Sequence, residues 1–249
     1  MSRPGLGPAP TAADVGIVAA LPMEMEALIG TFGNVRKFKG PRHRIIEGEC
    51  GGKVVALIVA GIGRANATRG TTLLLAGHRP RWVVSAGFGG ALDPVLKRND
   101  VVLPSVILGA GGQRFAIDVT VPPGAEGFRP GTLATIDKIL RTAAEKAELR
   151  ARTGADVVDM ETAAVAELCG ERGVRLLALR VVSDEAGVDL PPEILTILGP
   201  TGSYRLGAAV GAIWRRPSSL KELWGLREHA MEAADRLAEV LPAVIARLP

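Results

Sequence analysis

Short, near-continuous apolar runs recur along the chain, separated by segments of polar or small side chains. Runs of this length without alternation are typical of strands buried on both faces of a sheet. The strands predicted in this way cover residues 15–20, 82–86, 97–109 and 176–182. The helices predicted between them cover residues 23–32, 64–76 and 163–168. This order predicts an α/β fold: a single domain with three layers, α/β/α, around a central, mixed and twisted sheet.

Three further segments complete the predicted organisation. Residues 35–60 form an antiparallel pair of strands around a turn at Gly51-Gly52, and residues 109–131, rich in Gly and Pro, form a loop. The chain closes with an amphipathic helix over residues 220–248. The residues that form its apolar stripe are Leu223, Leu226, Ala230, Ala233 and Leu237.

We expect this final helix to pack either on the sheet or on a partner subunit. A third possibility is that Trp214, Trp224 and the neighbouring arginines touch a membrane surface. Residues 1–13 are predicted as a flexible tail and residues 14–249 as a single domain.

Composition narrows the function classes. Apolar residues make up 47% of the chain and charged residues 22%, which suits a protein with a substantial core. The formal net charge is +4 and the basic residues are scattered, so nucleic acid is not an expected partner. Cys50 and Cys169 suggest neither a zinc site nor a disulfide, and we expect no metal ion and no cofactor. Without a signal-peptide pattern or an apolar run of roughly 18 residues, we expect a cytoplasmic protein.

Acidic residues follow two of the predicted strands and one further short apolar run, Val157-Val158, which is predicted as another strand. Glu24 comes after residues 15–20, Glu161 follows Val157-Val158, and Asp184 ends the run at 176–182. In open α/β sheets, ligands bind at the carboxyl ends of the strands. A purely structural alternative exists, because acidic residues also stabilise helix amino ends.

Two glycine-rich turns lie at the same ends of strands. The first is Gly61-Ile62-Gly63 and the second is residues 87–90, Gly-Phe-Gly-Gly. Neither completes the dinucleotide-binding pattern GxGxxG, and no acidic residue stands about 20 residues beyond either cluster. The first turn, at a helix amino end, offers free backbone N–H groups that suit an anion or a polar oxygen, although it is equally explained as a tight turn.

Several of these segments resemble motifs of the nucleoside phosphorylase and nucleosidase superfamily. DMETAA at 159–164 and VVSDEA at 181–186 carry the resemblance, and AALPME, AGIG and SAGFGG agree with it. In motif order the chain is most similar to the 5′-methylthioadenosine/S-adenosylhomocysteine nucleosidases. Residues 135–146 and the region after Asp184 look more like a subgroup of hopanoid-associated phosphorylases, which would place an aliphatic groove at the 5′ side of the substrate.

The resemblance implies catalytic roles for two carboxyl groups. Glu24 would activate a water molecule, and Asp184 would protonate the leaving purine at N7. We expect burial beside apolar strands to keep Asp184 protonated near neutral pH. Glu161 would hold the ribose hydroxyls. Further substrate-binding residues implied are Ala60, Gly61, Gly87, Phe88, Gly89, Met160 and Ser183.

Some substrate contacts depart from the family pattern. In relatives, the strand matching residues 132–149 carries an aromatic residue that stacks on adenine, and Ile139 and Leu140 stand at that position. The alternative interpretation of Phe88 and Met160 is that they are ordinary core residues without a substrate contact.

The nucleophile is either water or phosphate. Phosphorylases of the superfamily carry a phosphate-binding arginine where this chain has Ser85, a neutral residue. Hydrolysis of a 5′-substituted adenosine is therefore the preferred hypothesis. The alternatives are a phosphorylase, which would act on an adenosyl-hopanoid, and a nucleoside-binding module without catalysis. The partners expected are a small-molecule nucleoside and further copies of the chain in a homo-oligomer.

Overall fold

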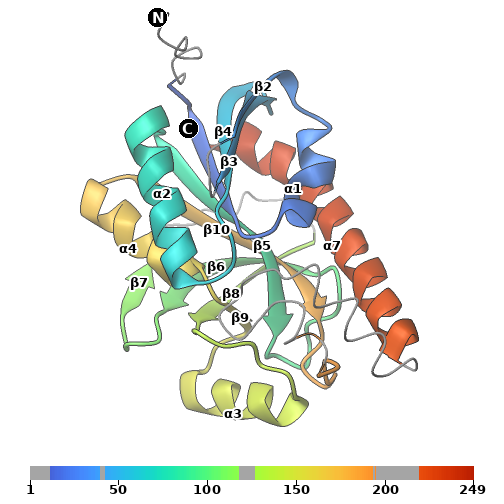
Figure 1. The fold of residues 1–249 in the computed structure, drawn as a ribbon. Coiled ribbons are helices and arrows are strands. Elements are labelled where there is room, and N and C mark those ends of the chain that lie inside the picture. Colours follow the sequence, from blue (N-terminus) through green and yellow to red (C-terminus); the bar gives the residue numbers. More distant parts are fainter. Residues whose placement is uncertain (1–11, 40–42, 118–126, 193, 195–218) are drawn as a thin grey trace, which may run out of the picture.

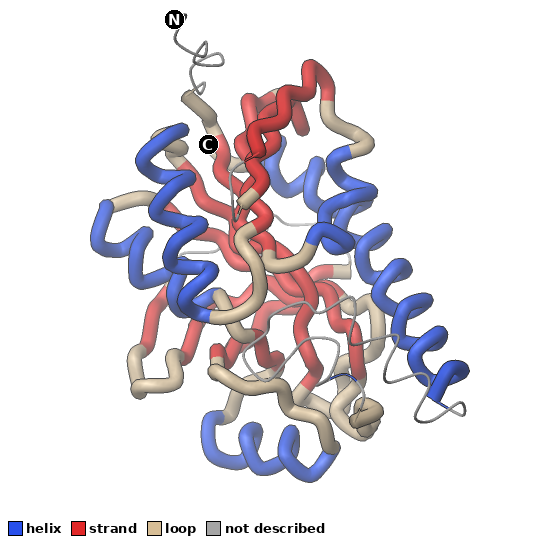
Figure 2. The backbone as a smooth tube through the Cα atoms, viewed as in Figure 1, coloured by secondary structure: helices blue, strands red, loops and turns tan. Residues whose placement is uncertain are grey.

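A twisted sheet runs through the centre of the molecule, with helices on both faces (Figures 1 and 2). The computed structural model describes residues 12–39, 43–117, 127–192, 194 and 219–249, with side chains from residue 227 in the last range. The described strands are β1 (Val15–Ala19), β2 (Gly33–Lys39), β3 (Arg44–Cys50), β4 (Lys53–Val59), β5 (Trp82–Ala91), β6 (Val101–Leu108), β7 (Arg114–Ala116), β8 (Phe128–Thr135), β9 (Val157–Asp159) and β10 (Arg175–Asp184). The described helices are α1 (Pro22–Ile29), α2 (Arg64–His78), α3 (Ala143–Thr153), α4 (Thr162–Arg172) and α7 (Ser219–Arg247).

The sheet combines parallel and antiparallel pairs. Strands β4, β1, β5 and β10 run parallel to one another in that order, and β3 and β2 extend this part as antiparallel strands. At the other end, β5, β9, β8, β6 and β10 pair in a closed circle. Helices α2 and α4 cover one face and α1 and α7 the other (Figure 1). The prediction of an α/β/α fold around a mixed, twisted sheet is confirmed.

The carboxyl ends of β5 and β10 lie side by side. Their parallel register pairs Arg180 with Gly87 and Val182 with Gly89. Since the two strands are long and buried, this register fixes which residues meet at the sheet edge.

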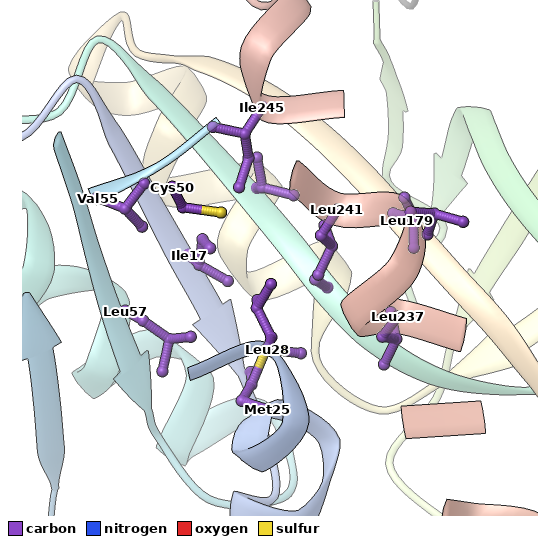
Figure 3. Close-up of a cluster of buried hydrophobic side chains, with 14 of the residues drawn as sticks. Ile17, Met25, Leu28, Cys50, Val55, Leu57, Leu179, Leu237, Leu241 and Ile245 are labelled. Atoms are coloured by element: carbon purple, nitrogen blue, oxygen red, sulfur yellow. The ribbon is translucent and has the colours of Figure 1, made fainter. Parts of the chain in front are cut away.

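The last helix packs on the sheet. Its buried side chains, Ala233, Leu237, Leu241 and Ile245, join the main apolar core. Figure 3 shows Leu237, Leu241 and Ile245 facing Met25, Leu28 and Ile17. Burial of each such large side chain stabilises the fold by about 1.5–3 kcal/mol. The side chains of Leu223, Trp224 and Leu226, like Trp214, lie outside the described residues.

The local turn prediction at Gly51-Gly52 is confirmed. The two glycines have φ of 59° and 75°, in the left-handed region, and they join β3 to β4 as an antiparallel hairpin. The expected first strand of this pair, residues 35–50, is wrong in one respect, because it holds two antiparallel strands, β2 and β3.

Three other predicted boundaries are wrong. The expected loop over residues 109–131 contains strand β7 and the first residues of β8, because both pair with β6. Strand β5 does not end at Ala86 but continues through the glycines to Ala91, because β10 and β9 pair with this part on its two sides. The strand expected to carry Ile139 and Leu140 ends at Thr135. Helix α3 starts soon afterwards, since the Thr142 side chain accepts a hydrogen bond from the N–H of Glu145 at 3.2 Å.

The division into a tail over residues 1–13 and one domain over 14–249 stays a prediction, since residues 1–11 lie outside the described part. Among the described helices, none combines the length and apolar character needed to cross a bilayer.

Candidate active site

Glu24 lies in the first turn of α1, directly after β1. Its Oε2 accepts hydrogen bonds from the N–H groups of Ala20 (2.9 Å) and Leu21 (2.7 Å), so it stabilises the helix start. Its Oε1 accepts from the N–H of Phe88 at 3.0 Å, across the sheet edge. The side chain is buried, and burial raises the pKa of Glu24 although these N–H groups partly offset the effect. The carboxylate therefore serves both as a helix cap and as part of the site.

A small pocket opens beside Glu24 at the carboxyl ends of β1, β4 and β5. It contains two acidic side chains, one basic side chain and otherwise small or apolar residues. The lining residues are Val18, Ala19, Ala20, Glu24, Ala60, Gly61, Ala67, Ser85, Ala86, Gly87, Phe88, Glu161 and Arg180. Six of the predicted site residues, Glu24, Ala60, Gly61, Gly87, Phe88 and Glu161, thus come together here.

Glu161 enters the pocket from the start of α4. Its Oε1 accepts a hydrogen bond from the N–H of Gly63 at 2.6 Å, in the first glycine-rich turn. Burial raises the pKa of Glu161 to about 8, and the negative charges of Asp159 and Glu24 add to this effect. A carboxyl group that is close to half ionised near pH 8 can accept a hydrogen bond from a sugar hydroxyl or donate one to it.

The glycines of β5 allow side chains to approach its backbone. A Cβ atom at Gly87 would lie 2.6 Å from Oε1 of Glu24, closer than any stable contact. A Cβ at Gly90 would lie 3.3 Å from Oδ2 of Asp184. Gly87 is thus required by the Glu24 carboxylate itself, in addition to any contact with a ligand.

Arg180 and Asp159 form the buried floor behind these groups. Arg180 Nη2 lies 2.6 Å from Oδ2 of Asp159, and its Nη1 donates to the carbonyl oxygen of Ser85 at 2.8 Å. Asp159 also accepts hydrogen bonds from the hydroxyl groups of Thr135 (2.6 Å) and Thr162. Nε of Arg180 is buried and makes no hydrogen bond within the described part of the chain.

Sequence reasoning missed both residues of this ion pair. A signal was present, because Arg180 stands inside the apolar run LLALRVV, and a buried charge in such a run needs a partner. Asp159 lies in DMETAA, two residues before Glu161.

Asp184 is the last residue of β10 and does not line the pocket. It lies against Gly90, three residues further along β5 than Gly87, the glycine against which Glu24 lies. Oδ1 accepts from the Ser183 hydroxyl at 2.7 Å. The expected apolar surroundings are wrong, because Lys146 Nζ lies 2.6 Å from Oδ2.

The remaining predicted contacts surround Asp184 or lie further away. Ser183 and Met160 are half-buried, and the Ser183 hydroxyl also approaches the carbonyl oxygen of Gly89 at 3.4 Å. Leu140 is buried in a small apolar cluster with Leu92, Ala134, Leu149, Ala155 and Val158, and Ile139 is half-buried. Neither of them lines the pocket, so their contact with a base stays a prediction.

The described residues hold no group of three or more His, Cys, Asp or Glu side chains placed to bind a metal ion.

Comparisons with known proteins show which family this chain belongs to. A family model described as the phosphorylase superfamily matches residues 14–126 and 124–195. A 5′-methylthioadenosine/S-adenosylhomocysteine nucleosidase of Actinobacillus succinogenes is 32% identical over 208 residues, which covers 70% of this chain and 88% of the relative. The nucleosidase of the same name from Bacillus subtilis is 27% identical over 199 residues, covering 70% and 86%.

Solved structures show the same fold. The 5′-methylthioadenosine/S-adenosylhomocysteine nucleosidase of Neisseria meningitidis, in complex with methylthio-immucillin-A, aligns with a TM-score of 0.73 at 23% identity, covering 96% of this chain and 99% of that one. The futalosine hydrolase of Helicobacter pylori aligns with a TM-score of 0.73 at 18% identity, covering 94% and 97%. The sequence match over most of the chain, together with this fold, shows that the protein belongs to the phosphorylase superfamily.

Proposed function

We propose that the protein is an N-glycosyl hydrolase, a nucleosidase that cleaves the bond between adenine and ribose in a 5′-substituted adenosine. The observation that carries the proposal is the convergence of Glu24 and Glu161 on one pocket at the carboxyl ends of the strands. The relative that is 32% identical bears the name of such a nucleosidase, and the match covers 88% of its length.

Cleavage of an N-ribosidic bond needs help at three points. The leaving purine must be protonated, the oxocarbenium-like ribosyl group must be stabilised, and a nucleophile must reach C1′. In the proposed mechanism Asp184 delivers the proton to N7, Glu161 binds the ribose hydroxyls, and Glu24 accepts a proton from the attacking water. The raised pKa of Glu24 suits a general base, because proton affinity rises with pKa.

The surroundings of Arg180 favour water over phosphate as the nucleophile. Among the pocket residues that the structure describes, Arg180 is the one basic side chain. Its charge is matched by Asp159 at 2.6 Å, and Ser85, also buried, is neutral. A phosphate dianion entering this pocket would meet two carboxyl groups without an unmatched cation, which is unfavourable.

The test is to incubate the protein with 5′-methylthioadenosine, S-adenosylhomocysteine and adenosine, each with and without phosphate, and to separate the products by chromatography. We expect adenine and the free 5′-substituted ribose, at a rate that does not depend on phosphate. Strict dependence on phosphate, with a ribose 1-phosphate product, would select a phosphorylase. Saturable binding without release of adenine would select a binding module.

The 5′ substituent is not assigned by this proposal. The aliphatic groove expected from the hopanoid-associated resemblance stays a prediction, because residues 195–218 lie outside the described part. The homo-oligomer and the cytoplasmic location likewise stay predictions.

A further inference from the structure

Lys146 on α3 carries a buried positive charge next to the proposed acid. Its side chain is 1% exposed, and Nζ lies 2.6 Å from Oδ2 of Asp184. The same Nζ donates hydrogen bonds to the carbonyl oxygens of Glu185 (2.7 Å) and Val188 (3.0 Å). An ammonium group has three N–H donors, so each of them has an acceptor.

All three acceptors belong to the last residue of β10 and to the segment that follows it. This stretch, residues 184–190, is also bound to the amino end of α3 by two further hydrogen bonds. The N–H of Leu190 donates to the carbonyl oxygen of Arg141 at 2.7 Å, and the N–H of Ala143 donates to Asp189 Oδ1 at 2.8 Å. Lys146 therefore holds the first part of a segment whose end is fixed by other groups.

Lysine is almost never fully buried unless it is paired, because removal of its charge from water is costly. Two of the acceptors of Lys146 are backbone carbonyl oxygens, which is a structural role, but the third is the carboxylate proposed to act in the reaction. The ammonium group is explained when the carboxylate next to it must be held in one orientation and must carry a negative charge at some point of the reaction.

We propose that Lys146 is a positioning residue for Asp184, a role that rests on the proposed nucleosidase function. The Ser183 hydroxyl holds Oδ1 and Lys146 holds Oδ2, so the carboxyl group cannot rotate away from the base. When the proton moves from the carboxyl group to N7 of the purine, Asp184 is left as a carboxylate. The ammonium group at 2.6 Å stabilises the carboxylate form before the step as well as after it, so the role assigned to Lys146 is to hold Asp184 in its orientation toward the base.

The experiment is a double-mutant cycle with Lys146→Met and Asp184→Asn. It measures kcat and KM for adenine release from 5′-methylthioadenosine, and the affinity for adenine by calorimetry. We expect Lys146→Met to lower kcat about 100-fold with KM near the wild-type value, since loss of orientation acts on the chemical step. On the Asp184→Asn background, the same substitution should cause no further loss, because its effect passes through Asp184.

Lys97→Met is the matched control. Lys97 Nζ lies 3.3 Å from Oε2 of Glu185, on the same segment, but the side chain is 64% exposed. This variant should keep the wild-type kcat. Should Lys146→Met fail to fold, Lys146→Gln takes its place; it keeps N–H donors without the charge and should also lower kcat with KM near the wild-type value, and a wild-type kcat in this variant would likewise overturn the role of Lys146.

The outcomes separate the two proposals. Wild-type kcat in Lys146→Met, or an equal further loss on the Asp184→Asn background, overturns the role of Lys146 alone. If the wild-type protein binds adenine but releases none from 5′-methylthioadenosine, the nucleosidase proposal is overturned. In that case the adenine affinities of the four proteins in the cycle test Lys146: non-additive changes support its action through Asp184, and additive changes overturn it. A protein that neither binds nor releases adenine overturns both.

Discussion

The guanidinium group of Arg180 on β10 lies 2.6 Å from the carboxylate of Asp159 on β9, and both side chains are shielded from solvent. The two residues are far apart along the sheet order but face the same space, because β5, β9, β8, β6 and β10 close into a circle. This ion pair supports the floor of the pocket, where Arg180 also contacts Ser85 and Thr162.

Arg180→Met should lower the free energy of unfolding by about 3–5 kcal/mol, because it leaves the Asp159 carboxylate buried without its partner. Urea denaturation followed by circular dichroism measures the change. Arg64→Met is the control: Arg64 pairs with Glu167 at 2.5 Å, but both side chains are about 40% exposed, so the change should be roughly 0–1 kcal/mol. Equal losses in the two variants would show that the buried pair Arg180–Asp159 stabilises the fold no more than the exposed pair Arg64–Glu167.

Gly87→Ala should lower kcat for adenine release about 100-fold, because the new Cβ displaces the Glu24 carboxylate, whose Oε1 would be only 2.6 Å away. Gly77→Ala is the matched control on the exposed side of α2, with no atom within 4 Å of the added Cβ. It should keep full activity and stabilise the helix by about 0.5–1 kcal/mol. Unchanged kinetics of Gly87→Ala would mean that the position of Glu24 does not limit the reaction.

Glu24→Gln should reduce kcat by a factor of about 10²–10⁴, the usual contribution of a general base, since an amide cannot accept the proton of water. Glu26→Gln provides the comparison, because Glu26 lies two residues further on the same helix and its side chain is exposed. The measurement is the initial rate of adenine release by each variant and by the wild-type protein. Similar rates for the two variants would remove Glu24 from the mechanism.

Asp184→Asn should lower kcat for adenine release at neutral pH by a factor of about 10²–10⁴ and leave a measurable residual rate, because asparagine keeps the shape of the side chain but has no acidic proton. Glu185→Gln is the control at the next position, where the carboxylate pairs only with the exposed Lys97 among the ion pairs of the described residues. It should retain nearly the wild-type rate. Substantial turnover by Asp184→Asn would show that another group protonates the base.

The raised pKa of Glu161 predicts how stability depends on pH. Burial raises the pKa of Glu161 from its ordinary value of 4.5 to about 8, so the folded protein holds a proton that the unfolded chain has lost between these values. The contribution of Glu161 to stability is therefore complete below pH 4.5 and is lost as the pH rises through about 8.

Glu161→Gln should accordingly flatten the fall in Tm between about pH 5 and pH 8. Some slope should remain, since burial also raises the pKa of Glu24. Asp93 and Glu145 act in the opposite sense and only at lower pH, because hydrogen bonds from backbone N–H groups lower their pKa values. Scanning calorimetry at several pH values, with Glu26→Gln as control, measures the slope; an unchanged slope in Glu161→Gln would refute the prediction.

The sequence by itself determined the elements whose cause is local. Apolar runs predicted the buried strands β1, β4 and β10, small residues followed by glycine predicted α4, and Gly51-Gly52 predicted the hairpin turn. The acidic residues at the strand ends could also be selected in advance. Strands β1 and β10 run parallel to β5, so position along the chain was enough to place Glu24 and Asp184 at one edge of the sheet, whereas Glu161 follows β9, which is antiparallel to β5.

Only the tertiary structure decided which side chains face one another there. Strand β5 continues through its glycines because β9 and β10 pair with it, and nothing within residues 82–91 encodes those partners. The pairs Arg180–Asp159 and Lys146–Asp184 join residues that are far apart in sequence. Such contacts depend on strand register and on the exclusion of water from the closed circle of strands, and both arise only when the chain has folded.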